Sequence, residues 1–293
     1  MSIVNVIGAA TIDILISNVE KNKFFSGKYK VNSIKNSFGG DALNEVSILN
    51  KYNVDTKLIS IVGNDQNGYL IKNYLDDHNI KYQNNLIKDN IETSVSLVLI
   101  EEDGNRSFVG NINGSVRLLD IDDIHIDDDA KIVGLASMFI SQNLTNDKLD
   151  VLFKSFKDKN ITTYVDFSNP KNNETINDLT FLKYIDYMFI NRHEASLICN
   201  NGDLLECENI LKSSGCKNVI IKCDKDGYLF DSKLNKPIGD NCIDSTGAGD
   251  SFVAGFVYGL VNNQDVQNCL KSANKLAYKS CQYIGATTWL EYE

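Results

Sequence analysis

Short apolar stretches that read as β-strands alternate with amphipathic, helix-like stretches along most of the 293-residue chain. Mostly apolar strands that alternate with helices predict a parallel sheet covered by helices on both faces, hence a three-layer α/β/α fold of the Rossmann-like type. Ligands of such sheets bind at the carboxyl ends of the strands. The strand-like runs are 3–8, 56–62, 131–135, 161–166, 184–190 and 218–222, and the helix-like runs are 42–52, 69–78, 146–159 and 203–214.

Two segments interrupt this alternation. Residues 14–37 lack a helical period and contain short β-prone pieces, and residues 93–110 read as a hairpin with Asp103-Gly104 at its turn. We expect them to form a small second sheet that covers the strand ends as a lid; the alternative is an edge extension of the main sheet. Since no linker-like tract occurs, we predict one domain over 1–293, with the lid contributed by 14–37 and 93–110.

The composition narrows the class of partner. A net charge of −10 argues against nucleic acid and against an anionic membrane surface. The longest apolar run, 252–261, is too short to cross a bilayer, and the N-terminus shows no signal-peptide pattern. Seven cysteines, an odd number with no CxxC pair, predict reduced thiols in a cytoplasmic protein. We therefore expect a small-molecule partner.

The segment Asp244-Ser245-Thr246-Gly247-Ala248-Gly249-Asp250-Ser251-Phe252 carries the strongest chemical signal. A glycine-rich turn runs there into an apolar helix, and the first N–H groups of a helix form a natural anion site. Asp250 then stands where an anion is expected, and accepting a proton from an attacking hydroxyl is a task that suits it. The alternative is an ordinary helix start with a preferred Asp.

A second glycine turn, Gly39-Gly40, precedes Asp41 and Asn44. Asp41 can cap the following helix, and the amide of Asn44 offers the donor and the acceptor that a polyol requires. Asp13 follows the first strand, where a carboxylate can accept from two sugar hydroxyls; it can equally be a turn residue.

Two further candidates lie at strand ends. Asn191 and Glu194 are three residues apart, so on a starting helix they share a face and could organise water around Mg²⁺. For the isolated NxxE pattern, a plain helix N-terminus is the better explanation. Lys222 could reach a phosphate, but a surface lysine is the simpler interpretation. The chain has no GxxxxGK[ST] motif and no GxGxxG after its first strand, which excludes a P-loop and disfavours a nicotinamide site.

In order and spacing, these motifs resemble those of the ribokinase-like (PfkB) carbohydrate kinases over essentially the full chain. Gly39-Gly40-Asp41-Ala42-Leu43-Asn44-Glu45 looks like the N-terminal signature of that family, and Asp244–Phe252 looks like its C-terminal signature. Residues 63–68 resemble its G-x-D-x-x-G segment, and 191–194 match its NxxE. The GGDALNE wording is closest to a branch of bacterial sugar kinases.

The resemblance implies transfer of a phosphoryl group from ATP to an alcohol group of a sugar, and it implies a role for each matching residue. Asp250 would be the base, with backbone N–H groups of Gly247, Ala248 and Gly249 around the transferring phosphate. The sugar would be held by Thr11, Asp13, Gly39, Gly40 and Asn44, with Arg106 of the lid. The nucleotide and Mg²⁺ would be bordered by Asn191, Glu194, Lys222, Asp224, Gly227, Thr246, Gly249 and Asn274.

A monovalent cation such as K⁺ is bound by many members of the family. The matching positions here are Asp244, Thr246, Ser280, Tyr283 and Gly285. Trp289 stands where a small residue of that site is often found, and Asp224 replaces a glycine that is usual before the nucleotide loop. The cation requirement and the nucleotide preference therefore stay open.

Three functions follow as hypotheses. The first is an ATP-dependent sugar kinase of the fructokinase or ribokinase kind, which the resemblance implies to be a homodimer joined through the lid. The second is a nucleoside kinase of the same superfamily. The nucleobase of its substrate would need an apolar or aromatic slot, which Phe24, Phe25, Phe38 and Phe108 could form; these residues could instead form the core of the lid. The third is a non-catalytic sensor of sugar or nucleotide.

Overall fold

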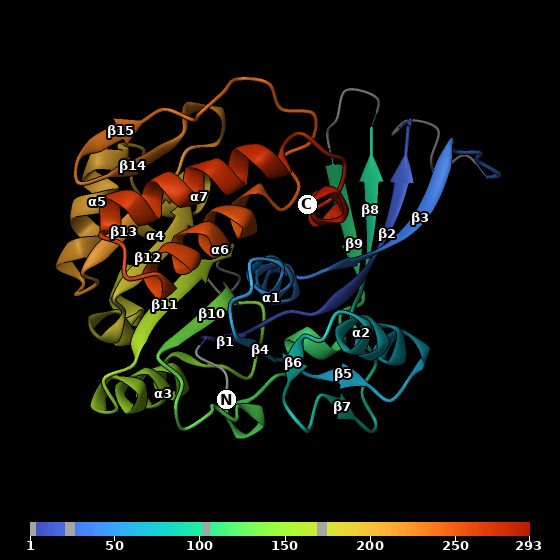
Figure 1. Ribbon diagram of the computed structural model, residues 1–293, viewed down its shortest axis with the longest axis horizontal. Coiled ribbons are helices and arrows are strands. Elements are labelled where there is room, and N and C mark those ends of the chain that lie inside the picture. Colours follow the sequence, from blue (N-terminus) through green and yellow to red (C-terminus); the bar gives the residue numbers. More distant parts are fainter. Residues whose placement is uncertain (1–3, 21–26, 102–105, 169–174) are drawn as a thin grey trace.

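A nine-stranded sheet forms the centre of the molecule, in the order β15-β14-β13-β12-β11-β10-β1-β4-β6 (Figure 1). The computed structural model describes residues 4–20, 27–101, 106–168 and 175–293. All neighbours from β13 to β6 pair in parallel, and only β14 and β15 are antiparallel. The strands are β1 Val4–Ile7, β4 Thr56–Ile59, β6 Lys81–Tyr82, β10 Ile132–Met138, β11 Thr162–Phe167, β12 Tyr187–Asn191, β13 Asn218–Lys222, β14 Tyr228–Phe230 and β15 Lys233–Asn235.

Helices cover both faces of this sheet, because successive strand residues point to opposite sides. In β12, Phe189 packs into one core, whereas Met188 and Ile190 pack into the other. The first core receives α1 Asp41–Lys51, α2 Gln66–Asp77, α6 Ala248–Val261 and α7 Val266–Ser280, and the second receives α3 Asn146–Asp158, α4 Arg192–Cys199 and α5 Leu204–Ser213. The predicted three-layer fold is confirmed.

A separate four-stranded sheet stands beside the main body, in the order β3-β2-β8-β9 (Figure 1). Its strands are β2 Thr11–Ser17, β3 Ser33–Gly39, β8 Val95–Ile100 and β9 Arg106–Gly110. This is the expected small lid sheet, and the alternative of an edge extension of the main sheet is wrong. The turn expected at Asp103-Gly104 lies outside the described residues.

The register of the lid sheet sorts its side chains onto two faces. Asp13, Ser37 and Ser96 share one row, and Arg106 lies in a row an even number of residues away, so these side chains share one face, called the inner face here. Arg106 bonds to Asp244 of the main body, which shows that the inner face is turned toward that body. The opposite, outer face carries Ile14, Ile16, Ile34, Leu97, Leu99 and Val109.

The run 56–62 was expected to be one strand, but it divides in two. β4 ends at Ile59, and β5 Val62–Gly63 pairs with β7 Ile87–Lys88 in a sheet of its own. Within the described part of the chain, no helix is long and apolar enough to cross a membrane.

Candidate active site

The glycine-rich segment forms the start of α6. Gly247 is the N-cap residue, with φ 69°, and a Cβ there would lie 2.6 Å from Cα of Ala286, so glycine is required. The N–H of Ala248 donates to the Ser245 carbonyl at 3.2 Å, which departs from the expectation that it faces a phosphate. The N–H groups of Gly247 and Gly249 have no acceptor among the residues described. An anion site at this helix start therefore depends on these two glycines.

Asp250 lies in the first turn of α6 and is only 9% exposed. Nδ2 of Asn44, on α1, donates to Oδ2 of Asp250 at 2.6 Å. This contact brings the two signature segments together although 206 positions separate them. Burial, and then the charge of Asp41, raises the pKa of Asp250 well above its ordinary value. A carboxylate with a raised pKa is a stronger proton acceptor, as a general base requires.

The first glycine turn closes against Asp13. A Cβ on Gly39 would lie 2.1 Å from Oδ2 of Asp13, and Gly40, at φ 92°, would place its Cβ 2.5 Å from the Ala9 carbonyl oxygen. Thr11 Oγ1 donates to Oδ1 of Asp13 at 3.0 Å and orients the carboxylate. Burial raises the pKa of Asp13 to about 6. The structure thus brings together four of the residues expected at the sugar: Thr11, Asp13, Gly39 and Gly40.

Asp41 does not cap α1, contrary to the expectation. Gly40 is the N-cap residue, and Oδ2 of Asp41 accepts a 2.5 Å hydrogen bond from Ser137 Oγ instead. Ser137 has φ 58° at the carboxyl end of β10, a conformation that costs a non-glycine residue about 1–3 kcal/mol. Such backbone strain is concentrated at functional sites.

Lys222 is not a surface residue, and that interpretation is wrong. It ends β13, and its Nζ contacts Oδ1 and Oδ2 of Asp166 at 2.6 and 2.8 Å. A side chain that is 17% exposed keeps its charge only beside such a partner, since burial alone would lower the pKa of Lys222, whereas Asp166 raises it. A Cβ on Gly249 would lie 3.3 Å from Lys222 Nζ, so the ammonium lies beside the start of α6.

Asp166 was missed by the sequence analysis. It lies at the carboxyl end of β11, between β10 and β12, and is 3% exposed. Burial raises its pKa to about 6, although Lys222 opposes the shift. An acidic residue inside an apolar strand, one position from its end, was the available signal.

Asn191 and Glu194 form a helix cap. Asn191 Oδ1 accepts from the Glu194 N–H at 2.8 Å, and Glu194 Oε2 accepts from the Asn191 N–H at 3.0 Å, which completes a capping box on α4. Burial raises the pKa of Glu194 to about 7. One buried carboxylate, with its other oxygen outside the capping box, fits Mg²⁺, which commonly takes one or two carboxylates along with water and phosphate. Among the described residues, no cluster of three or more His, Cys, Asp or Glu forms a metal cage.

The residues expected to border the nucleotide begin in the turn that follows β13. Asp224 has φ 51°, the left-handed conformation that favours the glycine usual in the family, and its side chain is exposed at 75%. Arg192 bonds to Asp226 beside it at 2.6 Å. Gly227, at φ 97°, has no room for a Cβ because the Asn235 carbonyl oxygen would lie 1.9 Å away. Asn274 Nδ2 donates to the Lys236 carbonyl and so fixes the loop opposite.

The five expected cation ligands also lie close together, but they are engaged with one another and with Arg106. Asp244 accepts from the guanidinium of Arg106, from Thr246 and from the Gly285 N–H. Ser280 Oγ donates to the Ala277 carbonyl, and Tyr283 stacks on Tyr292. Arg106, expected at the sugar, contacts this loop instead.

Glu45 of the N-terminal signature is fully buried and accepts a 2.5 Å hydrogen bond from the Tyr164 hydroxyl. Burial raises the pKa of both groups well above their ordinary values.

No aromatic slot forms from Phe38 and Phe108, because they lie on opposite faces of the lid sheet. Phe38 stacks on Tyr74, and Phe108 is 67% exposed. Phe108 is not lid core either; Phe24 and Phe25 lie outside the described residues.

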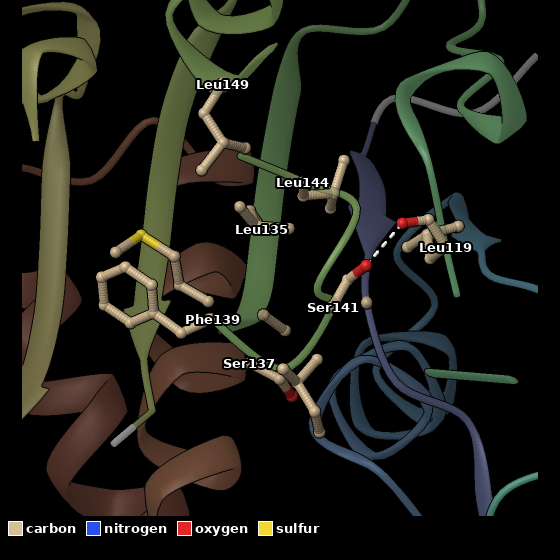
Figure 2. Close-up of a pocket in the computed structure, with 11 residues that line it drawn as sticks. Leu119, Leu135, Ser137, Phe139, Ser141, Leu144 and Leu149 are labelled. Carbon is tan, nitrogen blue, oxygen red and sulfur yellow. Dashed lines mark hydrogen bonds between the residues drawn. The ribbon is translucent and has the colours of Figure 1, made fainter. Parts of the chain in front are cut away.

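A small cavity of about 10 Å³ lies under the loop that follows β10, and Figure 2 shows its lining. Leu119, Leu135, Leu144 and Leu149 surround it, and Ser141 turns its hydroxyl to the Leu119 carbonyl at 2.5 Å. This volume holds one water at most, so the cavity is not a substrate site.

Residues 1–291 match the pfkB family of carbohydrate kinases. A ribokinase of Dictyostelium discoideum is 25% identical, over 97% of this chain and 96% of its own length. A fructosamine kinase of Bacillus subtilis is 27% identical over 85% of each chain. Among solved structures, the ribokinase of Arabidopsis thaliana complexed with ribose and ATP superposes with a TM-score of 0.80 at 22% identity, and covers 99% of this chain and 96% of its own.

The fold, the glycine turn at α6 and the family match define a phosphotransferase with an alcohol group as acceptor. The chain belongs to the pfkB family of carbohydrate kinases.

Proposed function

We propose that this protein transfers the γ-phosphoryl group of ATP to a hydroxyl of a sugar, with Asp250 as the general base. One observation carries the proposal: Asp250 is buried in the first turn of α6 and is bonded to Asn44 of the opposite signature segment. Asp250 thus joins the signature segment expected at the sugar to a helix start whose glycine N–H groups suit a phosphate. Similarity to ribokinases supports the same chemistry.

In this proposal each group of the site has its own role. Asp13, Asn44 and the Gly39-Gly40 turn would bind the sugar hydroxyls. Gly247 and Gly249, with the ammonium of Lys222, would stabilise the charge that spreads over the transferring phosphoryl group, since positioning and electrostatics dominate such reactions. Mg²⁺ supplies charge neutralisation between the phosphates when it is bound, and Glu194 would hold it with Asn191 nearby.

The remaining expectations extend this proposal. Asp224, Gly227, Thr246 and Asn274 would border the nucleotide. The seven free thiols of the described chain accord with a cytoplasmic enzyme. The apolar outer face of the lid sheet, where Ile34 and Val109 are 65% and 53% exposed, fits a homodimer joined through that sheet.

The test is the substitution Asp250→Asn. It keeps the size and an acceptor for Asn44 but removes the proton acceptor, so we expect kcat to fall by about 10²- to 10⁴-fold. Binding of ATP, measured by calorimetry, should be retained, since Asp250 is not proposed to bind the nucleotide. ADP release with a panel of pentoses, hexoses, sugar acids and nucleosides provides the activity readout.

Asp77→Asn, an exposed carboxylate at the end of α2, is the matched control and should be fully active. Near-wild-type turnover by Asp250→Asn would remove Asp250 from the chemistry. If a sugar stabilised the wild-type protein against heat while no substrate released ADP, the sensor function would replace the kinase.

A further inference from the structure

Arg106 and Asp244 form an ion pair that joins the lid sheet to the loop before α6. Arg106 begins β9, and Asp244 lies three residues before the N-cap of α6. The two side chains are 19% and 4% exposed. A salt bridge so protected from solvent is screened much less by salt than a surface pair.

The carboxylate of Asp244 is almost fully used. Oδ1 accepts from Arg106 Nη2, from the Thr246 N–H at 2.9 Å and from Thr246 Oγ1 at 2.7 Å, and Oδ2 accepts from the Gly285 N–H at 2.8 Å. Each carboxylate oxygen has two lone pairs, so Oδ1 with its three donors is fully used and Oδ2 keeps one lone pair.

Other oxygens near this loop are also engaged. The Ser280 hydroxyl donates to the Ala277 carbonyl, and the Ser280 carbonyl accepts from the Tyr283 N–H at 3.2 Å. The Ala286 carbonyl, next to Gly285, accepts from Nε1 of Trp289, which is fully buried where the family often has a small residue. Asp244 is the one charged group among the expected ligands, so with Arg106 bound to it the residues present offer a monovalent cation no negative partner.

Charge leads to the same result. One carboxylate balances one positive charge, and the guanidinium supplies it. A second cation beside the guanidinium would be repelled by it, because two like charges interact strongly at short range away from bulk water. In the described chain, the groups facing Asp244 bring no second carboxylate into hydrogen-bond contact with this loop.

We propose that the guanidinium of Arg106 permanently takes the place of the monovalent cation beneath the phosphate-binding loop. Because Arg106 belongs to the lid sheet, the charge that supports this loop comes from the element that covers the sugar. Arg106 is thus a positioning residue that acts on Gly247 and Gly249 through Asp244. This inference rests on the proposed kinase activity only in its kinetic arm.

The first measurement is the melting temperature in KCl and in tetramethylammonium chloride at equal ionic strength. We expect the wild-type protein to melt at the same temperature in both salts. Arg106→Met frees Asp244 and should melt at a higher temperature in KCl, because K⁺ can then enter. Arg106→Lys keeps the charge and should respond to K⁺ much less than Arg106→Met does. Lys233→Met, which removes an exposed charge on β15, is the control and should behave as wild type.

The second measurement is turnover in the same two salts. Wild-type kcat should differ by less than about twofold, whereas Arg106→Met should lose at least about tenfold of kcat in tetramethylammonium, a change of about 1.4 kcal/mol. K⁺ should restore part of that loss, while the KM for the sugar changes little.

A wild-type protein that melts higher in K⁺, or that needs K⁺ for turnover, overturns the proposal. So does an Arg106→Met protein whose only change is a raised KM for the sugar, because Arg106 would then contact substrate. If the wild-type protein phosphorylates nothing in the panel, the kinase proposal fails and the melting temperatures still decide the cation question.

Discussion

Five carboxylates of the candidate site have raised pKa values, and three of them, Asp166, Glu194 and Asp250, interact with the ammonium of Lys222. The pKa of Asp13 and of Asp166 is raised to about 6 and that of Glu194 to about 7, while the pKa values of Glu45 and Asp250 are raised well above their ordinary values. Burial is the largest cause in each, and mutual repulsion adds to it. Keeping these carboxylates ionised therefore costs folding free energy, a cost that proteins accept at functional sites.

The cost can be measured at Glu194, as a dependence of stability on pH. The pKa of Glu194 is about 7 in the folded protein and about 4.5 ordinarily, so the folded state binds more protons between these values and stability falls as pH rises through that window. Glu194→Gln cannot ionise but can still cap α4. We expect this variant to be more stable than wild type by on the order of 2 kcal/mol at pH 8, and equally stable near pH 4.

Urea unfolding at the two pH values measures this difference. The same variant should bind Mg²⁺-ATP more weakly if Glu194 holds the metal. A stability difference that does not change with pH would show that Glu194 is not the titrating group.

At the scale of elements, α2 is fixed by one side chain at its start. Asp65 caps the helix by accepting from the Gly68 N–H, and it also accepts from the N–H and Oγ1 of Thr93, which leads into β8. Burial alone would raise the pKa of Asp65, but these bonds lower it. The G-x-D-x-x-G segment thus joins the main body to the lid sheet.

Asp65→Ala should destabilise the protein by about 2–3 kcal/mol at pH 7, because it removes a cap and leaves Thr93 without its acceptor. Asp265→Ala on α7 is the matched comparison: the bonds given for its carboxylate stay within the helix start, so it should cost about 1 kcal/mol. Since the pKa of Asp65 is lowered, its contribution is present above the ordinary pKa and is lost as pH falls through the lowered one. Equal losses for the two variants would contradict the tertiary role of Asp65.

At the scale of the whole molecule, the lid sheet turns one face to the site and carries apolar side chains on the other. Part of this outer face is covered, because Phe38 stacks on Tyr74 of α2. The apolar side chains that stay exposed on it are typical of an interaction surface. Exposed Ile34 and Val109 lie on the outer face, in neighbouring rows of the same parity. This arrangement is the structural basis for the proposed homodimer.

Val109→Asp should dissociate that dimer, because it buries a charge in the proposed interface. Analytical ultracentrifugation should show a dimer for the wild-type protein and a monomer for the variant. Leu234→Asp, on an exposed position of β15 far from the lid sheet, should remain dimeric. A monomeric wild-type protein would exclude the interface outright.

The alternation of strands with helices and the strands of the lid could be predicted from the sequence, because apolar runs and turn residues report local preference. The glycine turns and Asp250 were found for the same reason: Gly40 and Gly247 adopt conformations that other residues avoid. The partners of Lys222 and Arg106 could not be found this way. Asp166 and Asp244 lie 56 and 138 positions from them, so only tertiary packing creates those pairs. Asp41 shows the converse: the residue type predicted a helix cap, but its carboxylate bonds to Ser137 of β10 instead.

The contact between Asn44 and Asp250 can form only late in the synthesis of the chain. Chains emerge from the ribosome N-terminal end first, so α1 and the first half of the sheet are synthesised long before α6. Until α6 is made, the amide of Asn44 has no Asp250 to bond to, and the side of α1 that packs on α6 is uncovered. Fragments that end before residue 248 lack the proposed base and expose this side of α1, so we expect chaperones and proteases to bind them.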